Sequence, residues 1–142
     1  MKTNFSSETS LRVRYGETDQ MGYSYYGNYA QYFEVGRVEA LRALGISYKT
    51  LESQDVMLPV SEFNVRYKKP AMYDDELLIC TKIVAINGSR IHFEYTITNE
   101  TGNLICEGLT TLVFIAKSTM KPIRPPANFM AIVRPFEVKT DG

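Results

Sequence analysis

Residues 12–45 read RVRYGETDQMGYSYYGNYAQYFEVGRVEALRALG, and this stretch contains the one convincing pattern for a long helix. Residues 11–15 alternate apolar and basic side chains, which predicts a strand with one buried face. Residues 16–27 are rich in glycine and polar groups and indicate a loop. Apolar side chains then recur at three- and four-residue steps over residues 28–44, and Gly45 is a typical stop signal. We therefore expect one long helix after the loop.

Beyond this stretch the chain is expected to be mostly strand. Four segments carry alternating or β-branched apolar residues, and turn sequences such as Asn87-Gly88 separate them. Strands joined by short turns form antiparallel sheets. We therefore expect an α+β fold in which a five- to six-stranded antiparallel sheet wraps around one long central helix, with residues 1–142 as a single domain. The expected strands cover residues 63–67, 77–86, 91–98 and 104–116.

The two ends of the chain give weaker signals. Residues 1–9 are polar and are expected to be a loose start, and the proline-rich segment after Ser118 has no assignable period. A single helix is also too narrow to cover every apolar position of five strands. We therefore expect a second subunit to bury either the uncovered sheet face or a sheet edge, and the protein to be a homo-oligomer.

Composition argues against several classes of protein. The chain carries 16 Lys and Arg against 16 Asp and Glu, so no net charge draws it toward nucleic acid or an anionic membrane. No apolar run approaches the about 20 residues of a membrane span, and the start lacks the apolar stretch of a signal peptide. Cys80 and Cys106 are expected to be inert core thiols in a cytoplasmic protein. His92 is the sole histidine and falls on the polar face of its strand, which excludes zinc sites with several histidine ligands.

The loop before the helix carries the most promising chemistry. Glu17 and Asp19 precede a helix start, where unpaired N–H groups and the positive end of the peptide dipoles meet. Such a site can hold a carbonyl oxygen that becomes negative during acyl transfer, while a nearby carboxylate attacks the carbonyl or activates water. Gly22 and Gly27 allow a ligand to approach the backbone closely. The same residue types also serve ordinary turns and helix caps, and Asn28 is expected to be such a cap.

Two blocks of the sequence resemble the 4-hydroxybenzoyl-CoA thioesterase family, the hotdog-fold acyl-CoA thioesterases. The first block, residues 12–45, contains a T-D-x-x-G core, an Asn–Tyr pair and a helix with a central arginine. The second block, residues 67–77, reads YKKPAMYDDEL and is similar to the family's Tyr-x-x-Pro-Ala turn before an acidic pair and a long strand. The expected order of elements matches the hotdog fold over nearly the whole chain. The matching residues of the first block are Tyr15, Thr18, Asp19, Gly22, Tyr26, Asn28, Tyr29 and Arg37.

The resemblance implies a thioester hydrolase that releases a free carboxylic acid and coenzyme A. Asp19 would be the catalytic carboxylate, as nucleophile or as general base for water, and the backbone N–H of Tyr26 would polarise the thioester carbonyl. Members of the family have their active site at a dimer interface, and the resemblance implies no metal or redox cofactor. The residues implied to bind the acyl-CoA substrate are Gly22, Tyr25, Asn28, Lys68, Lys69 and Arg90, the last three toward the phosphates.

Several alternatives stay open at this point. Many acyl-CoA members of the family have histidine where this chain has Tyr26, although the mechanism requires only the backbone N–H. Lys68 and Lys69 are equally typical of a solvated strand end. Acyl carrier protein could replace coenzyme A as the carrier, or the chain could bind acyl thioesters without hydrolysing them. Arg37 is expected to pair with one of the two loop carboxylates, and a homotetramer is favoured by family analogy alone.

Overall fold

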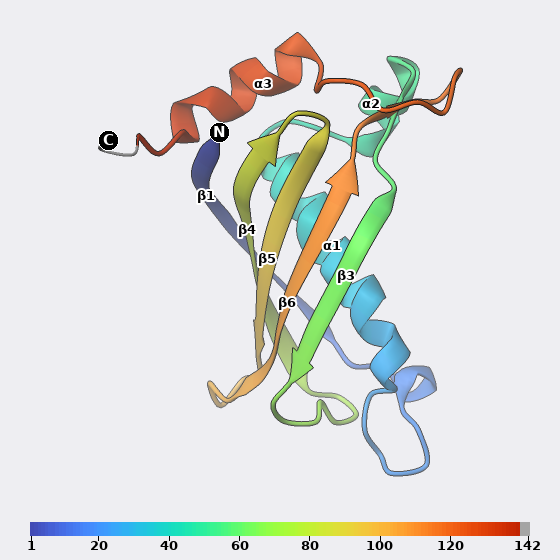
Figure 1. The fold of residues 1–142 in the computed structure, drawn as a ribbon. Coiled ribbons are helices and arrows are strands. Elements are labelled where there is room, and N and C mark those ends of the chain that lie inside the picture. The colour runs from blue at the N-terminus through green and yellow to red at the C-terminus, as the bar shows by residue number, and fades with distance from the viewer. Residues whose placement is uncertain (140–142) are drawn as a thin grey trace.

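A long helix lies across one face of a five-stranded antiparallel sheet in the computed structural model, which describes residues 1–139 (Figure 1). The helix is α1, Tyr29–Ala43. The strands are β1 Lys2–Arg12, β3 Val60–Tyr67, β4 Glu76–Asn87, β5 Arg90–Thr98 and β6 Leu104–Val113. Their order is β1-β4-β5-β6-β3, so the meander of β4, β5 and β6 is central and β1 and β3 are the edges. The expected long helix and antiparallel sheet are therefore confirmed. The strand expected over residues 11–15 ends at Arg12, and Tyr15 begins a short 3-10 turn.

Shorter elements, most of which the sequence pattern did not reveal, lie at both ends of the sheet. The segment after Ser118, which had no assignable period, contains a helix whose Phe129 ring lies 5.0 Å from the ring of buried Phe114. The shorter elements are η1 Tyr15–Glu17, η2 Tyr26–Asn28, α2 Tyr48–Ser53, β2 Val56–Met57, β7 Ile115–Ala116, α3 Ala127–Val133 and η3 Arg134–Phe136. Among the helices of residues 1–139, none is both long enough and apolar enough to cross a membrane.

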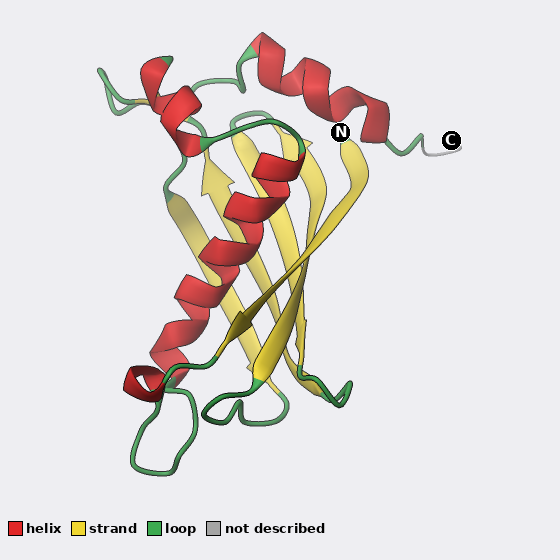
Figure 2. Ribbon diagram, turned by 180° about the vertical axis from the view of Figure 1, so that it is seen from behind, coloured by secondary structure: helices red, strands yellow, loops and turns green. Residues whose placement is uncertain are grey.

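The core lies between α1 and the sheet face that α1 covers. Figure 2 shows α1 lying over that face of the sheet. Side chains that alternate along β5 point into it, and Ile91, Phe93 and Ile97 are fully buried. Phe33 of α1 stacks on Tyr95 of β5 with ring centroids 4.3 Å apart. The side chains that alternate along the strands pack against the apolar face of α1 at this interface. Each element therefore has the apolar period from which the sequence predicted it.

Strand β1 corrects the expectation of a loose start. Its residues read KTNFSSETSLR and show no clear apolar alternation, yet the strand pairs with β4 from Lys2↔Ala85 to Arg12↔Glu76. Because β1 is an edge strand with few fully buried side chains, backbone pairing defines it more than side-chain burial does. The C-terminal segment lies beside its first residue, where the Val138 N–H donates to the Lys2 carbonyl at 2.8 Å.

The sheet face that α1 leaves uncovered is largely polar. His92 lies on this face, as expected, with Nδ1 3.0 Å from the Thr111 hydroxyl. Cys80 also lies on it and is only partly buried, so the expectation of a core thiol is wrong for Cys80, whereas Cys106 is fully buried. The error follows from the position of Cys80 in β4, whose outward side chains alternate with the buried ones.

The free edge of β3 is the most apolar part of the exposed sheet. Val60, Phe63 and Tyr67 are between 44% and 49% exposed. Within residues 1–139 no strand pairs with the outer side of β3. Exposed, unpaired strand edges with apolar side chains are typical contact surfaces for another chain.

Candidate active site

The loop between β1 and α1 is a compact turn that holds Asp19 in place. The Asp19 N–H donates to the Tyr23 carbonyl at 2.8 Å, and the Gly22 N–H donates to the Asp19 carbonyl at 3.0 Å. Gly22 has a φ of 79°, a conformation that side chains with a Cβ disfavour. Asp19 Oδ1 accepts the N–H groups of Met21 at 2.9 Å and of Tyr23 at 3.2 Å. The carboxylate is thus exposed and fixed, and Oδ2 makes no hydrogen bond to the described residues.

Asp19 borders a cavity of about 310 Å³ between this loop and the segment that follows β3. Four of its nine lining residues are tyrosines, and it holds four of the eight predicted site residues. Tyr67 donates its hydroxyl proton to the Tyr26 carbonyl at 3.2 Å, which joins the two walls. The lining residues are Asp19, Tyr23, Ser24, Tyr26, Tyr29, Tyr67, Lys68, Lys69 and Pro70.

Backbone N–H groups are available where the helix begins. The short turn η2 runs directly into α1, because the Tyr29 N–H donates to the Tyr26 carbonyl. The N–H groups of Tyr26 and Gly27 have no hydrogen-bond acceptor among the described residues. Free N–H groups at a helix start attract negative charge. The Tyr26 N–H and the Asp19 carboxylate therefore belong to two residues that line the same cavity.

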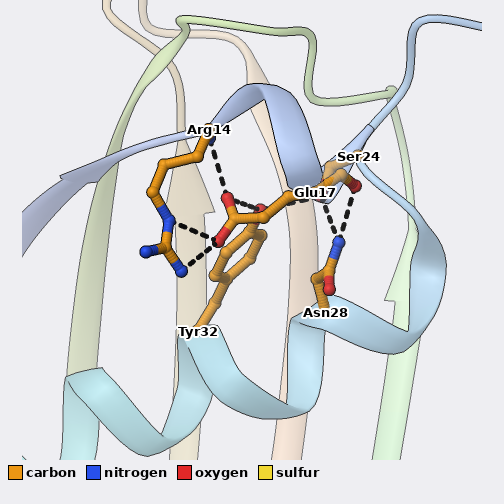
Figure 3. A network of polar contacts seen from close by, with 5 residues as sticks. All are labelled: Arg14, Glu17, Ser24, Asn28 and Tyr32. Atoms are coloured by element: carbon orange, nitrogen blue, oxygen red, sulfur yellow. Dashed lines mark hydrogen bonds and ion pairs between the residues drawn. The ribbon is translucent and has the colours of Figure 1, made fainter. Parts of the chain in front are cut away.

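A network of polar contacts lies behind the cavity wall (Figure 3). The Glu17 carboxylate accepts hydrogen bonds from Arg14, whose Nη2 lies 3.1 Å away, and from the Tyr32 hydroxyl at 3.1 Å. The Tyr32 hydroxyl lies 2.7 Å from Ser24 Oγ. Asn28 Nδ2 donates to the Glu17 carbonyl at 2.7 Å and, more weakly, to Ser24 Oγ at 3.4 Å. These contacts tie the loop to the first turn of α1.

Asn28 therefore acts differently from the expected helix cap. Its side chain makes no capping hydrogen bond to α1, because its amide is turned toward Glu17 and Ser24. Asn28 does not line the cavity, and neither do Gly22 and Tyr25, although both lie in the same loop. The substrate contacts predicted for these three residues stay predictions.

Arg90 lies at the wrong end of the sheet to reach this cavity within one chain. It opens β5 and pairs with Val113. The strand register places the cavity residue Tyr67 beside Cys106, which in turn pairs with Ile97 near the other end of β5. A contact between Arg90 and a ligand in the cavity would have to come from a second copy of the chain.

Burial perturbs several groups near the site. Burial raises the pKa of Tyr32 to about 12, with the Ser24 hydroxyl opposing and Glu17 adding to the rise. Burial likewise raises the pKa of Tyr29, and it raises the pKa of the Cys106 thiol to about 12. These three groups are therefore protonated at neutral pH and are unsuited to act as bases there.

Arg37 corrects another expectation, because it pairs with neither loop carboxylate. It is 8% exposed and lies beside the phenol groups of Tyr48 and Tyr95. Its place in the second half of α1 explains the error, since the loop meets the helix at the opposite end. Within residues 1–139 no three His, Cys, Asp or Glu side chains converge as a metal site.

Sequence reasoning missed Ser24, Tyr29, Tyr67 and Pro70 as cavity residues. Tyr29, Tyr67 and Pro70 were noted only as parts of the two motifs, without a role at the site. Ser24 carried no signal, because its role depends on a contact with Tyr32 that only the fold creates. A second hollow of about 760 Å³ lies on the uncovered sheet face beside His92, away from the loop.

Comparison with known proteins places these features in a family. YneP of Bacillus subtilis is 36% identical over 118 residues, which cover 83% of this chain and 86% of YneP. The acyl-CoA thioesterase YbgC of Haemophilus influenzae is 30% identical, with 85% of this chain and 89% of YbgC covered. The DHNA-CoA thioesterase structure from Staphylococcus aureus shares 41% identity and a TM-score of 0.81, covering 84% of this chain and 80% of the other.

The solved structures also settle the fold. A 4-hydroxybenzoyl CoA thioesterase shares only 19% identity but superposes with a TM-score of 0.82 over 91% of this chain and 99% of its own. The resemblance drawn from the two sequence blocks is therefore confirmed, together with the hotdog fold and the expectation of a thioesterase. Residues 13–133 match the family pattern, so the chain belongs to the thioesterase-like superfamily.

Proposed function

We propose that the chain hydrolyses acyl-CoA thioesters to a free carboxylic acid and coenzyme A in the cavity beside Asp19. One observation carries the proposal: the exposed Asp19 carboxylate borders the same cavity as Tyr26, whose N–H has no acceptor among the described residues. A carboxylate and an oxyanion donor are the two groups that thioester hydrolysis requires. The name of the relative YbgC, an acyl-CoA thioesterase, supports coenzyme A as the carrier.

The chemistry can follow two courses from this arrangement. In both, the Tyr26 N–H stabilises the negative charge that develops on the thioester oxygen. As a nucleophile, Asp19 Oδ2 attacks the carbonyl carbon and the thiolate leaves, and water then hydrolyses the mixed anhydride. As a general base, Asp19 takes a proton from water as the water oxygen attacks, and that proton then goes to the departing thiolate. Either course returns Asp19 to its ionised form.

Lys68 and Lys69 are the proposed contacts for the phosphates of coenzyme A. Both line the cavity and are exposed, and Lys69 Nζ lies 3.4 Å from Asn103 Oδ1. Two adjacent ammonium groups at a cavity rim favour a phosphate-bearing ligand. An acyl carrier protein is the second candidate carrier, because ATL3 of Arabidopsis thaliana, an acyl-acyl carrier protein thioesterase, is 27% identical over 124 residues.

A second copy of the chain is proposed to complete the enzyme. The exposed apolar edge of β3 ends at Tyr67, which lines the cavity, so a partner on that edge would border the site. We favour a homotetramer in the cytoplasm, and the two free thiols accord with a reducing compartment. Residues 1–142 are proposed to form one domain.

The test is a thiol-release assay over short, long, branched and aromatic acyl-CoAs, with acyl carrier protein thioesters beside them. Asp19→Asn is expected to lower kcat at least about 100-fold, because the amide is neither a nucleophile nor a base. The matched control is Asp55→Asn: Asp55 is also an exposed loop carboxylate that accepts a backbone N–H, from Ser118 at 2.9 Å, but it lies outside the cavity. Wild type that releases thiol from no substrate, or Asp19→Ala with wild-type rates, would overturn the proposal.

A single turnover in ¹⁸O-labelled water separates the two courses. In the nucleophilic course, water that attacks the aspartyl carbonyl of the anhydride leaves the heavy oxygen in the Asp19 carboxylate, so labelled Asp19 identifies this course. General-base catalysis sends the heavy oxygen directly into the released acid. Mass spectrometry of the peptide that contains Asp19 reads the difference.

A further inference from the structure

We propose that Ser24 and Tyr32 are positioning residues of the hydrolytic site, an inference that rests on the proposed function. Their paired hydroxyl groups are hydrogen-bonded to the Glu17 carboxylate. They fix the position of the segment that carries the Tyr26 N–H relative to Asp19. Ser24 is 6% exposed and lines the cavity, whereas Tyr32 is 2% exposed in the first turn of α1. The pair thus joins the cavity wall to the helix.

The hydrogen bonds of this pair can run in only one direction. An ionised Glu17 carboxylate only accepts, so the Tyr32 hydroxyl donates its proton to Glu17 Oε1. The Tyr32 oxygen is then free to accept, so Ser24 donates to it across 2.7 Å. Asn28 Nδ2 in turn donates to Ser24 Oγ. The side chains of Glu17, Tyr32, Ser24 and Asn28 thus form a row in which each of these hydrogen-bonding groups has a partner. A buried network with all partners present is rigid and specific.

Glu17 links this row to both catalytic elements. Its carbonyl oxygen accepts the Tyr25 N–H at 2.8 Å and Asn28 Nδ2 at 2.7 Å, and these two residues flank the Tyr26–Gly27 pair. Asp19 follows Glu17 by two residues in the same loop. A shift of Glu17 relative to the start of α1 would therefore change the distance between the Asp19 carboxylate and the Tyr26 N–H. The Ser24–Tyr32 pair opposes such a shift.

Loss of either hydroxyl should reduce turnover more than substrate binding. Removing one partner leaves the other hydroxyl buried with an unmet hydrogen bond, so the segment loosens. Displacement of an oxyanion donor by a fraction of an ångström lowers the rate of the chemical step. The lysines at the cavity rim are outside the row, so KM should change little.

The experiment compares Tyr32→Phe, Ser24→Ala and the double variant in the thiol-release assay. We expect kcat of each single variant to fall about tenfold, with KM within about twofold of wild type. The matched control is Tyr95→Phe, which removes a buried tyrosine hydroxyl that lies 2.6 Å from the Thr110 hydroxyl in the core. Tyr95→Phe should lower the melting temperature to a similar extent but leave kcat unchanged.

The double variant tests whether the two hydroxyls act as a unit. If they do, the kcat of the double variant is no lower than that of the less active single variant, because neither hydroxyl is left without its partner. Wild-type kcat in Tyr32→Phe, or an equal loss in Tyr95→Phe, overturns this inference alone. A wild-type protein that hydrolyses no thioester overturns the proposed function and this inference with it.

Discussion

Phe33 reaches the sheet because Gly108 has no side chain. The ring lies where a Cβ on Gly108 would stand, and its other face stacks on Tyr95 at 4.3 Å. The missing side chain on β6 thus makes room for the Phe33 ring of α1 against the sheet. The N-terminal end of α1, with the Tyr26 N–H, is carried on the same rigid helix.

Gly108→Ala is therefore expected to destabilise the protein. The added methyl group overlaps the Phe33 ring, and forcing extra volume into a packed core costs about 1–3 kcal/mol in the free energy of unfolding. Gly16→Ala is the control, because a Cβ there meets no atom within 4 Å, and its effect should stay within about 0.5 kcal/mol. Equal urea denaturation midpoints for the two variants would contradict this account of the interface.

At the scale of residues, the sequence predicted some of the residues that line the cavity but not the contacts between side chains. Asp19 and Tyr26 lie in a recognisable motif, and both line the cavity. Ser24 and Tyr32 could not be predicted, because a serine in a loop and a tyrosine in a helix show no sign of facing each other until the chain folds. Arg37 was misassigned for the same reason: its charge suggested a carboxylate partner, but the core offers it phenols.

Among the elements, the two edge strands behave in opposite ways. Strand β1 is polar, pairs along its whole inner side with β4, and was not predicted over residues 2–9. Strand β3 was predicted from its alternating apolar residues, yet Phe63 and Tyr67 are exposed in a single chain and Val65 is only partly buried. An alternating apolar pattern indicates that one face of a strand is buried, either within its own chain or against a second chain. The pattern of β3 is thus better explained by an oligomer than by the isolated chain.

Phe63→Lys tests this explanation of β3. A charge at the centre of the exposed edge should prevent a partner strand from packing there and yield monomers in sedimentation analysis. Leu109→Lys is the control: Leu109 is 51% exposed on the uncovered sheet face and not at the edge. Dissociation by Leu109→Lys in place of Phe63→Lys would assign the interface to the uncovered face.

For the molecule as a whole, buried protonated groups predict that the free energy of unfolding falls at alkaline pH. The Cys106 thiol is fully buried, and burial raises its pKa from 9.0 to about 12. A raised pKa means that the folded state holds this proton more tightly than the unfolded chain does. The contribution of this proton to the free energy of unfolding is therefore complete below pH 9 and is lost as pH rises toward 12. Tyr32 adds to the same trend.

Urea denaturation at pH 8 and pH 10.5 measures this loss. Cys106 alone should lower the free energy of unfolding by roughly 2 kcal/mol between the two values, since one unit of pKa corresponds to about 1.4 kcal/mol. Cys106→Ala should remove that part of the difference, although it lowers stability at both values through the cavity it leaves. Cys80→Ala, at the partly exposed thiol, should keep the wild-type difference. An unchanged difference in Cys106→Ala would refute the assignment.

The hydrogen bond between Val138 and Lys2 brings the N-terminal strand and the C-terminal segment together at one pole of the molecule, opposite the loop of Asp19 (Figure 1). A fluorophore, an affinity tag or a surface tether attached near either terminus would therefore stand clear of the cavity. The same proximity would allow circular permutation: a short linker from Lys139 to Met1, with new ends opened at the Asn87-Gly88 hairpin, would leave the end of the molecule that holds the cavity unchanged.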